Sequence, residues 1–171
     1  MFSRRKNQVV AAIAALTILA SSLAATPLVR AQSSQSAASR SLEGAWWVTV
    51  AVYDCATLAR KGNFTSILLF SRGGTVSETT SNPAFLPGQR SVGFGTWSLS
   101  DDGTYSATDV AFILSAGGPF QVGTQKLVHS ITLNSDASQW TDQATVDFYT
   151  AAGMPIAPMH ACAVAAANRL Q

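Results

Sequence analysis

The sequence predicts an all-β protein that folds as one antiparallel, up-and-down β-barrel of about eight strands. Short β-branched and aromatic segments recur along the chain and are separated by turn-forming residues. No segment shows a long apolar repeat with the 3.6-residue period of a helix. Strands at this spacing fit a sandwich or a barrel. A closed barrel is favoured because closure removes the exposed edges of the sheet.

Residues 1–31 have the pattern of an export signal. Arg4-Arg5-Lys6 is a positive start, Val9 to Ala20 is an apolar run, and Val29-Arg30-Ala31 is a small-x-small cleavage site. We therefore expect cleavage after Ala31 and a periplasmic or secreted protein. A retained membrane anchor is the alternative, but the apolar run is short for a membrane span.

The export signal also accounts for the basic charge of the chain. Four of the 11 basic residues lie within it, so the remainder carries seven basic against nine acidic residues, a net charge of −2. No basic stripe is present there, which argues against nucleic-acid binding. The remaining chain is long enough to bury a core without metal, and no metal or cofactor is expected.

Residues 32–42 are rich in serine, alanine and glutamine and lack apolar periodicity. They predict a flexible leader. From residue 43 to residue 171 the alternating segments follow one another closely, so this range is expected to be the barrel domain.

Strong turn signals divide the first half of the domain. Arg72-Gly73-Gly74 and Asp101-Asp102-Gly103 suit tight hairpins, whereas residues 81–90, with two prolines and a glycine, predict a long loop. The segments between these breaks are β-branched, aromatic or alternating. Strands are expected over residues 46–53, 63–71, 75–80 and 92–99.

The second half is divided in the same way. Residues 116–123, with three glycines and a proline, predict a loop, and residues 134–137 predict a turn. The last segment is rich in alanine and would suit a helix, but Pro155 and Pro158 argue against one over its first half. Strands are expected over residues 104–115, 124–133, 138–150 and 154–166.

Cys55 and Cys162 are the two cysteines of the chain. An exported protein meets an oxidising compartment, and these cysteines lack a recognisable metal-binding spacing, so we predict a structural disulfide. Reactive or metal-binding thiols are the alternative. His160 lies two residues before Cys162 and shares its strand face, which predicts a surface histidine beside the disulfide.

Strand alternation predicts which side chains face the interior. If Trp46 points inward, every second residue of its strand does so too, and the sixth and seventh strands each have one apolar face. Each of those two faces also contains one ionisable residue, His129 or Asp142. The predicted cavity residues are Trp46, Val48, Val50, Leu127, His129, Ile131, Trp140 and Asp142.

A four-residue turn over residues 134–137 would set His129 directly opposite Asp142. Such a pair could anchor a ligand, or act as base and orienting group in acid–base chemistry. Alternatively, the two side chains simply satisfy each other in a packed interior, or a shifted register keeps them apart. The sequence presents no identifiable nucleophile, so no catalytic residue is predicted.

The layout resembles the calycin superfamily of lipocalins and their relatives, in a bacterial, lipocalin-like form. The resemblance is carried by Gly44-x-Trp46 at the first strand, by the run of about eight strands, and by Arg169 just past the last strand. It implies that Trp46 plugs the floor of the barrel and that Arg169 packs across it. Bacterial metalloprotease inhibitors also resemble this layout, with a leader that enters the protease cleft.

Three functions are therefore considered. The leading hypothesis is an exported binding protein that holds a small hydrophobic molecule in the barrel. The second is a cavity enzyme of the isomerase, cyclase or dehydratase type. The third is a protein-interaction role in which residues 32–42 act as an inhibitory leader on a protein partner.

Overall fold

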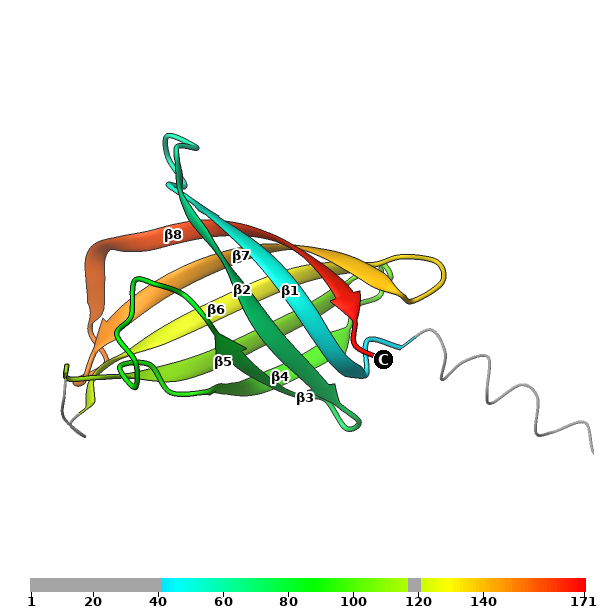
Figure 1. Cartoon of the computed structure of the whole chain (residues 1–171), viewed down its shortest axis with the longest axis horizontal. Coiled ribbons are helices and arrows are strands. Elements are labelled where there is room, and N and C mark those ends of the chain that lie inside the picture. The colour runs from blue at the N-terminus through cyan, green and yellow to red at the C-terminus, as the bar shows by residue number, and fades with distance from the viewer. Residues whose placement is uncertain (1–40, 117–120) are drawn as a thin grey trace, which may run out of the picture.

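A computed structural model describes residues 41–116 and 121–171. Within them, eight antiparallel strands form one closed barrel in which each strand pairs with its neighbours in sequence (Figure 1). The strands are β1 (Gly44–Tyr53), β2 (Arg60–Ser71), β3 (Thr75–Thr80), β4 (Gly93–Leu99), β5 (Tyr105–Leu114), β6 (Gln121–Leu133), β7 (Gln139–Thr150) and β8 (Pro155–Arg169). The predicted fold class is confirmed. The predicted export signal and residues 32–40 of the predicted leader lie outside the described residues.

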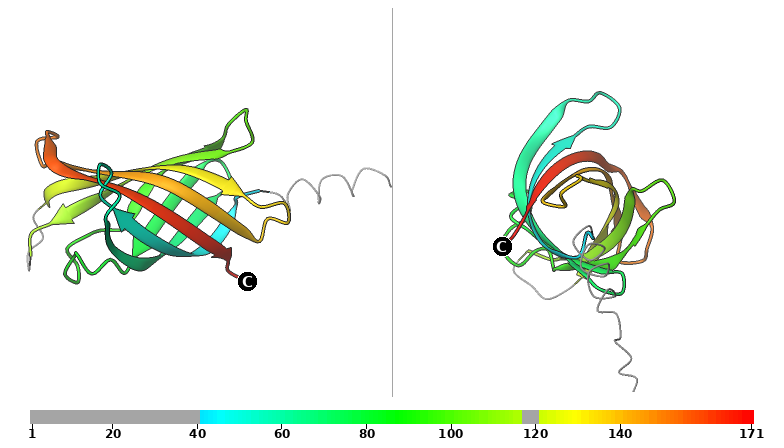
Figure 2. Two further views of the ribbon diagram at one scale, coloured as in Figure 1. Left: turned by 90° about the horizontal axis from the view of Figure 1, so that it is seen from above. Right: turned by 90° about the vertical axis from the view of Figure 1, so that its right-hand side faces the viewer.

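The first and last strands close the ring. β1 and β8 pair from Trp46–Arg169 at one end to Tyr53–Cys162 at the other. The view along the barrel in Figure 2 shows this continuous ring, from which the β1–β2 hairpin flares outward. The alanine-rich segment is thus a strand. Small side chains on the inner face of β8 leave room inside the barrel, because alanine fills little of the space that a larger residue would occupy.

The two ends of the barrel differ. One end carries the short β2–β3, β4–β5 and β6–β7 hairpins together with the C-terminus (Figure 1). The opposite end carries the β1–β2 and β7–β8 connections and the long loop between β3 and β4. We call the first end the floor and the second end the mouth.

A packed aromatic cluster seals the floor. Trp46 is fully buried, and its ring centroid lies 6.0 Å from that of Trp140. Phe70 contacts Trp140 and Trp97 edge-on, at 6.5 and 5.9 Å between ring centroids. Edge-on and tilted contacts suit aromatic rings because they place the positive rim of one ring against the negative face of another.

The chain leading into β1 belongs to this floor. Leu42 is fully buried, and its carbonyl accepts a hydrogen bond from the Trp46 indole at 2.9 Å. The sequence predicts that Leu42 ends the flexible leader, but in the structure Leu42 is part of the core. An isolated leucine beside polar residues gives no periodic signal, so its burial could not be predicted.

Arg169 ties the end of β8 to the start of β1. Its guanidinium carbon lies 4.2 Å from the centre of the Trp46 ring, a cation–π contact. The same group donates hydrogen bonds to the carbonyls of Ser41, Glu43 and Ala137. Gly44 is required beside it because its φ is +125° and an added Cβ would lie 2.6 Å from the guanidinium.

The predicted disulfide is present at the mouth. Cys55, just after β1, is bonded to Cys162 of β8, with 5.1 Å between their Cα atoms. The neighbouring His160 is exposed, as predicted, and its Nδ1 lies 2.6 Å from Oδ1 of Asp147. A disulfide of this kind indicates an oxidising, extracellular-type compartment.

The described residues contain no helix that is long and apolar enough to span a membrane.

Candidate functional site

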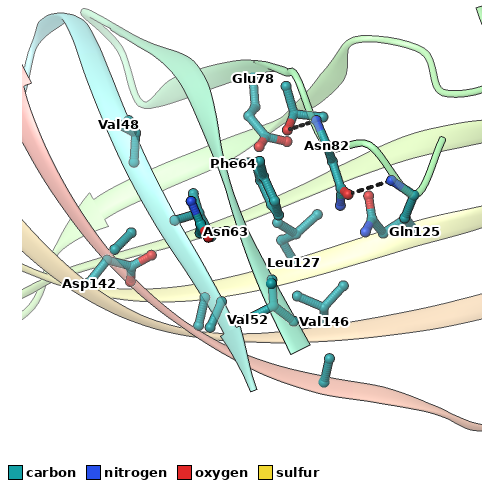
Figure 3. A pocket seen from close by; sticks show the side chains of 18 of the residues that line it. Val48, Val52, Asn63, Phe64, Glu78, Asn82, Gln125, Leu127, Asp142 and Val146 are labelled. Carbon is teal, nitrogen blue, oxygen red and sulfur yellow. Dashed lines mark hydrogen bonds between the residues drawn. The ribbon is translucent and has the colours of Figure 1, made fainter. Parts of the chain in front are cut away.

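A cavity of about 490 Å³ occupies the barrel between the floor and the mouth. Figure 3 shows side chains from β1, β2, β6 and β7 converging on it. Its volume lies within the usual range for small-molecule sites. The apolar lining consists of Val48, Val50, Val52, Phe64, Leu68, Pro83, Ala84, Phe85, Leu127, Trp140, Ala144, Val146, Phe148, Ala161, Ala163 and Ala165.

Six of the eight predicted cavity residues line this space: Val48, Val50, Leu127, His129, Trp140 and Asp142. Trp46 and Ile131 also point inward, but they are fully buried in the packed floor cluster below it. Alternation alone predicts a side chain's face and not its height along the barrel axis, so it could not separate floor from cavity.

His129 lies between two carboxylates. Its Nδ1 is 2.6 Å from Oδ2 of Asp142, and its Nε2 is 3.1 Å from Oδ1 of Asp109. All three side chains are buried. The predicted contact between His129 and Asp142 is therefore present, and Asp109 adds a second partner from β5.

The register that produced this contact differs from the predicted one. Asp142 pairs with Ile131, and His129 pairs with Ala144, two residues from the expected register. The difference arises at the turn, where Asn134 and Gln139 are hydrogen-bonded and Ala137 has a φ of 56°. The His129–Asp142 contact survives because it runs diagonally between neighbouring strands on the same face.

The two carboxylates determine the protonation of the imidazole. Burial by itself lowers the pKa of His129 because it disfavours the charged form. Hydrogen bonds to Asp109 and Asp142, together with their negative charges, outweigh burial and raise this pKa to about 10. At neutral pH the group is therefore an imidazolium with both N–H donors engaged.

A second buried ion pair lies on the wall beneath the long β3–β4 loop. Arg90 donates to Oε2 of Glu78 and to Oε1 of Gln125, both at 2.5 Å. Ser66 donates to the other oxygen of Glu78 at 3.0 Å. The side chains of Arg90 and Glu78 are 4% and 5% exposed, so this pair is almost completely desolvated. The long loop that contains Arg90 thus contributes part of the cavity wall.

Sequence reasoning missed Asp109, Glu78 and Arg90. Asp109 alternates with Ala107 and Ala111 on the inner face of β5, the same pattern of one ionisable residue on an apolar face that indicated His129. That signal could have found it. Glu78 lies in a polar strand and Arg90 in a loop, where no periodicity distinguishes an inward residue.

The structure does not support a metal site at the mouth. Ligand atoms of Cys55, His160 and Cys162 lie within 4.8 Å of one another. Both sulfur atoms belong to the disulfide, however, and therefore cannot act as thiolate ligands.

Comparisons with family models, with curated proteins and with solved structures found no match to this chain. The functional proposals below therefore depend on the geometry of the barrel itself.

Proposed function

We propose that this protein is an exported binding protein that holds a small, largely hydrophobic molecule inside its barrel. The observation that carries the proposal is the cavity of about 490 Å³, which has an apolar lining and a few convergent polar groups. This combination is typical of small-molecule sites, where apolar contact supplies affinity and polar groups fix orientation. The packed floor closes one end of the barrel, so a ligand would enter from the mouth.

The shape of the cavity supports a ligand with an apolar body. Valines of β1 and alanines of β8 form adjoining parts of the wall, which continues through Val146 and Phe148 of β7 to Leu127 of β6. Among the polar groups of the lining, Asp142 lies on one side of the cavity, and Glu78, Asn82 and Gln125 lie on another (Figure 3). A molecule that lays its apolar part along this wall would meet a polar group, Asp142, at its inner end.

The state of His129 favours binding over acid–base catalysis. A general base needs a free nitrogen lone pair near its substrate. In His129, Asp109 and Asp142 occupy both nitrogens, and they raise the pKa to about 10. The imidazolium therefore has no lone pair to offer at neutral pH, and its structural role is to hold the two carboxylates together.

Export and calycin kinship are part of the same proposal. The disulfide supports an oxidising compartment, and residues 1–31 have the composition of a cleaved signal. Kinship with lipocalin-like calycins is supported by the buried Trp46, by the Arg169 contact across it and by Gly44. The inhibitor hypothesis rests on residues 32–42; of these, Ser41 and Leu42 are bound to the floor.

Ligand binding can be tested with a matched pair of variants on β8. Ala163 lines the cavity, whereas Val164 is exposed on the outside of the same strand. Ala163→Phe should fill part of the cavity and reduce the affinity for Nile red, a neutral hydrophobic dye, at least tenfold. Val164→Phe should leave this affinity unchanged. The measurement is a fluorescence titration of the purified, delipidated protein.

The thermal transition of each variant would serve as the folding control, and native mass spectrometry of the exported protein would look for a copurified molecule. Equal dye affinity in wild type and in folded Ala163→Phe would contradict the proposal, because the dye would then be bound elsewhere.

A further inference from the structure

The charged side chains buried inside the barrel do not balance one another. Three buried acids, Glu78, Asp109 and Asp142, face two buried cations, Arg90 and protonated His129. Glu78 and Arg90 neutralise each other, so the imbalance falls on the group formed by Asp109, His129 and Asp142. With its carboxylates ionised, that group carries one uncompensated negative charge.

The remaining basic residue of the lining does not compensate this charge. Lys61 belongs to the mouth, where its Nζ lies 2.9 Å from Asp54 and its side chain is about half exposed. The other polar groups that line the cavity, Asn63, Thr80, Asn82 and Gln125, are neutral. Arg90 is already engaged by Glu78 and Gln125. The inner part of the cavity therefore has acceptor character.

Asp142 presents this character to the cavity. Its Oδ1 accepts one hydrogen bond from the Ser130 amide, and its Oδ2 contacts His129. A carboxylate offers about four lone-pair positions, so Asp142 retains capacity for a further donor. Figure 3 shows its carboxylate directed into the pocket. At the other nitrogen of His129, Oδ2 of Asp109 is buried without a hydrogen-bond partner among the described residues.

An uncompensated buried charge is costly, and a ligand can remove that cost. Removing an ion from water costs several kcal/mol even after relaxation, unless a partner of opposite sign is supplied. A cationic group beside Asp142 would supply it. A carboxylate at the same place would add a second negative charge to a site of low dielectric constant, where like charges repel strongly.

We infer that the molecule bound in this cavity is an amphipathic amine, an apolar body with one protonated nitrogen that hydrogen-bonds to Asp142. This inference deepens the proposed function and rests on it. The apolar body occupies the cavity beside the valines of β1 and the alanines of β8, and the ammonium group reaches the inner acidic group.

Three ligands with the same chain and different head groups test the inference on the wild-type protein. Decylamine, decanol and decanoate are titrated at pH 7 against bound Nile red, below their micellar concentrations. Decylamine should displace the dye at a concentration at least tenfold lower than decanol, and decanoate should be the weakest. Equal affinity for decylamine and decanol, or tightest binding of decanoate, would overturn the inference.

Matched charge variants show whether Asp142 is the cause. Asp142→Asn removes the excess charge with little change in shape, and it should reduce the preference for decylamine over decanol to about twofold or less. Asp147→Asn removes one charge from the outer face of the same strand, and it should leave the preference unchanged. A preference that survives in folded Asp142→Asn would contradict the inference.

Asp109→Asn provides a second test if Asp142→Asn does not fold. Asp109 does not line the cavity, so this substitution changes the interior charge without changing any ligand contact. The preference for decylamine should fall here as well, and an unchanged preference would count against the inference. If no ligand of the series displaces the dye, and the dye is insensitive to Ala163→Phe, the proposed function itself fails.

Discussion

The barrel contains two histidine–carboxylate contacts of equal length in very different surroundings. Inside, His129 lies 2.6 Å from Asp142 and is also bonded to Asp109. Outside, His160 lies 2.6 Å from Asp147, with side chains that are 51% and 37% exposed. Water and salt screen the outer pair, whereas the inner three groups are buried and have no counter-charge from solvent.

This comparison shows that burial, and not distance, determines what such a contact contributes. In the interior the imidazole holds together two carboxylates that would otherwise repel each other without solvent. On the surface the same contact can be replaced by water at little cost. Four experiments test how far the two sites differ.

The largest effect is expected from His129→Ala. This substitution leaves Asp109 and Asp142 buried without the cation between them. Losing one partner of a buried charged pair typically costs about 3–5 kcal/mol. The free energy of unfolding from urea titration at pH 7 should fall by about this amount. A loss below about 1 kcal/mol would show that the inner group is far better solvated than its burial indicates.

Raising the pH should remove the same cation without creating a cavity, so a somewhat smaller loss is expected. The pKa of His129 is raised by folding, so its contribution to stability is fully present below about pH 6.5, the unfolded value, and is lost as the pH rises toward 10. The free energy of unfolding should therefore decline across this window. The decline should persist in His160→Ala and largely vanish in His129→Ala.

Loss of the disulfide is expected to have the next largest effect. It would measure how much the bond between Cys55 and Cys162 contributes to the free energy of unfolding. The bond links residues 107 apart in sequence, and native disulfides typically stabilise by about 2–4 kcal/mol. The double variant Cys55→Ser with Cys162→Ser should lose about this much in urea titration. Wild-type protein treated with a reductant should match it, and the serine variant should not respond to the reductant.

The smallest effect is expected from His160→Ala. Exposed ion pairs contribute at most about 1 kcal/mol, because their charges remain solvated. The midpoint of urea unfolding should shift only slightly, and the shift should shrink further in high salt. A loss as large as that of His129→Ala would remove the distinction between the two sites.

Much of the interior could be predicted from local patterns. Turn signals such as Arg72-Gly73-Gly74 separated the strands, and alternation placed His129 and Asp142 on the inner face. The two cysteines, together with the predicted export signal, predicted the disulfide, which is confirmed. The strands and their faces depend on residues near one another in sequence and on a strand period of two that no distant contact can change. The disulfide could be predicted because the chain has two cysteines and therefore one possible intramolecular pairing.

The partners of those residues needed the tertiary structure. The β6–β7 register differs from the predicted one because the conformation of the turn, with Ala137 at positive φ, determines which residues pair. Asp109 meets His129 only because β5 and β6 are neighbours in the ring. Arg90 reaches Glu78 from a long loop whose path no periodicity describes.

The amino-acid sequence was thus enough to predict the strands, their inner and outer faces and the covalent bond between the two ends of the domain. The closed barrel was needed to show how high each inward residue lies, which inward charges meet, and that a cavity remains above the packed floor. Alternation is a property of one strand, whereas height, charge balance and empty volume are properties of the closed ring.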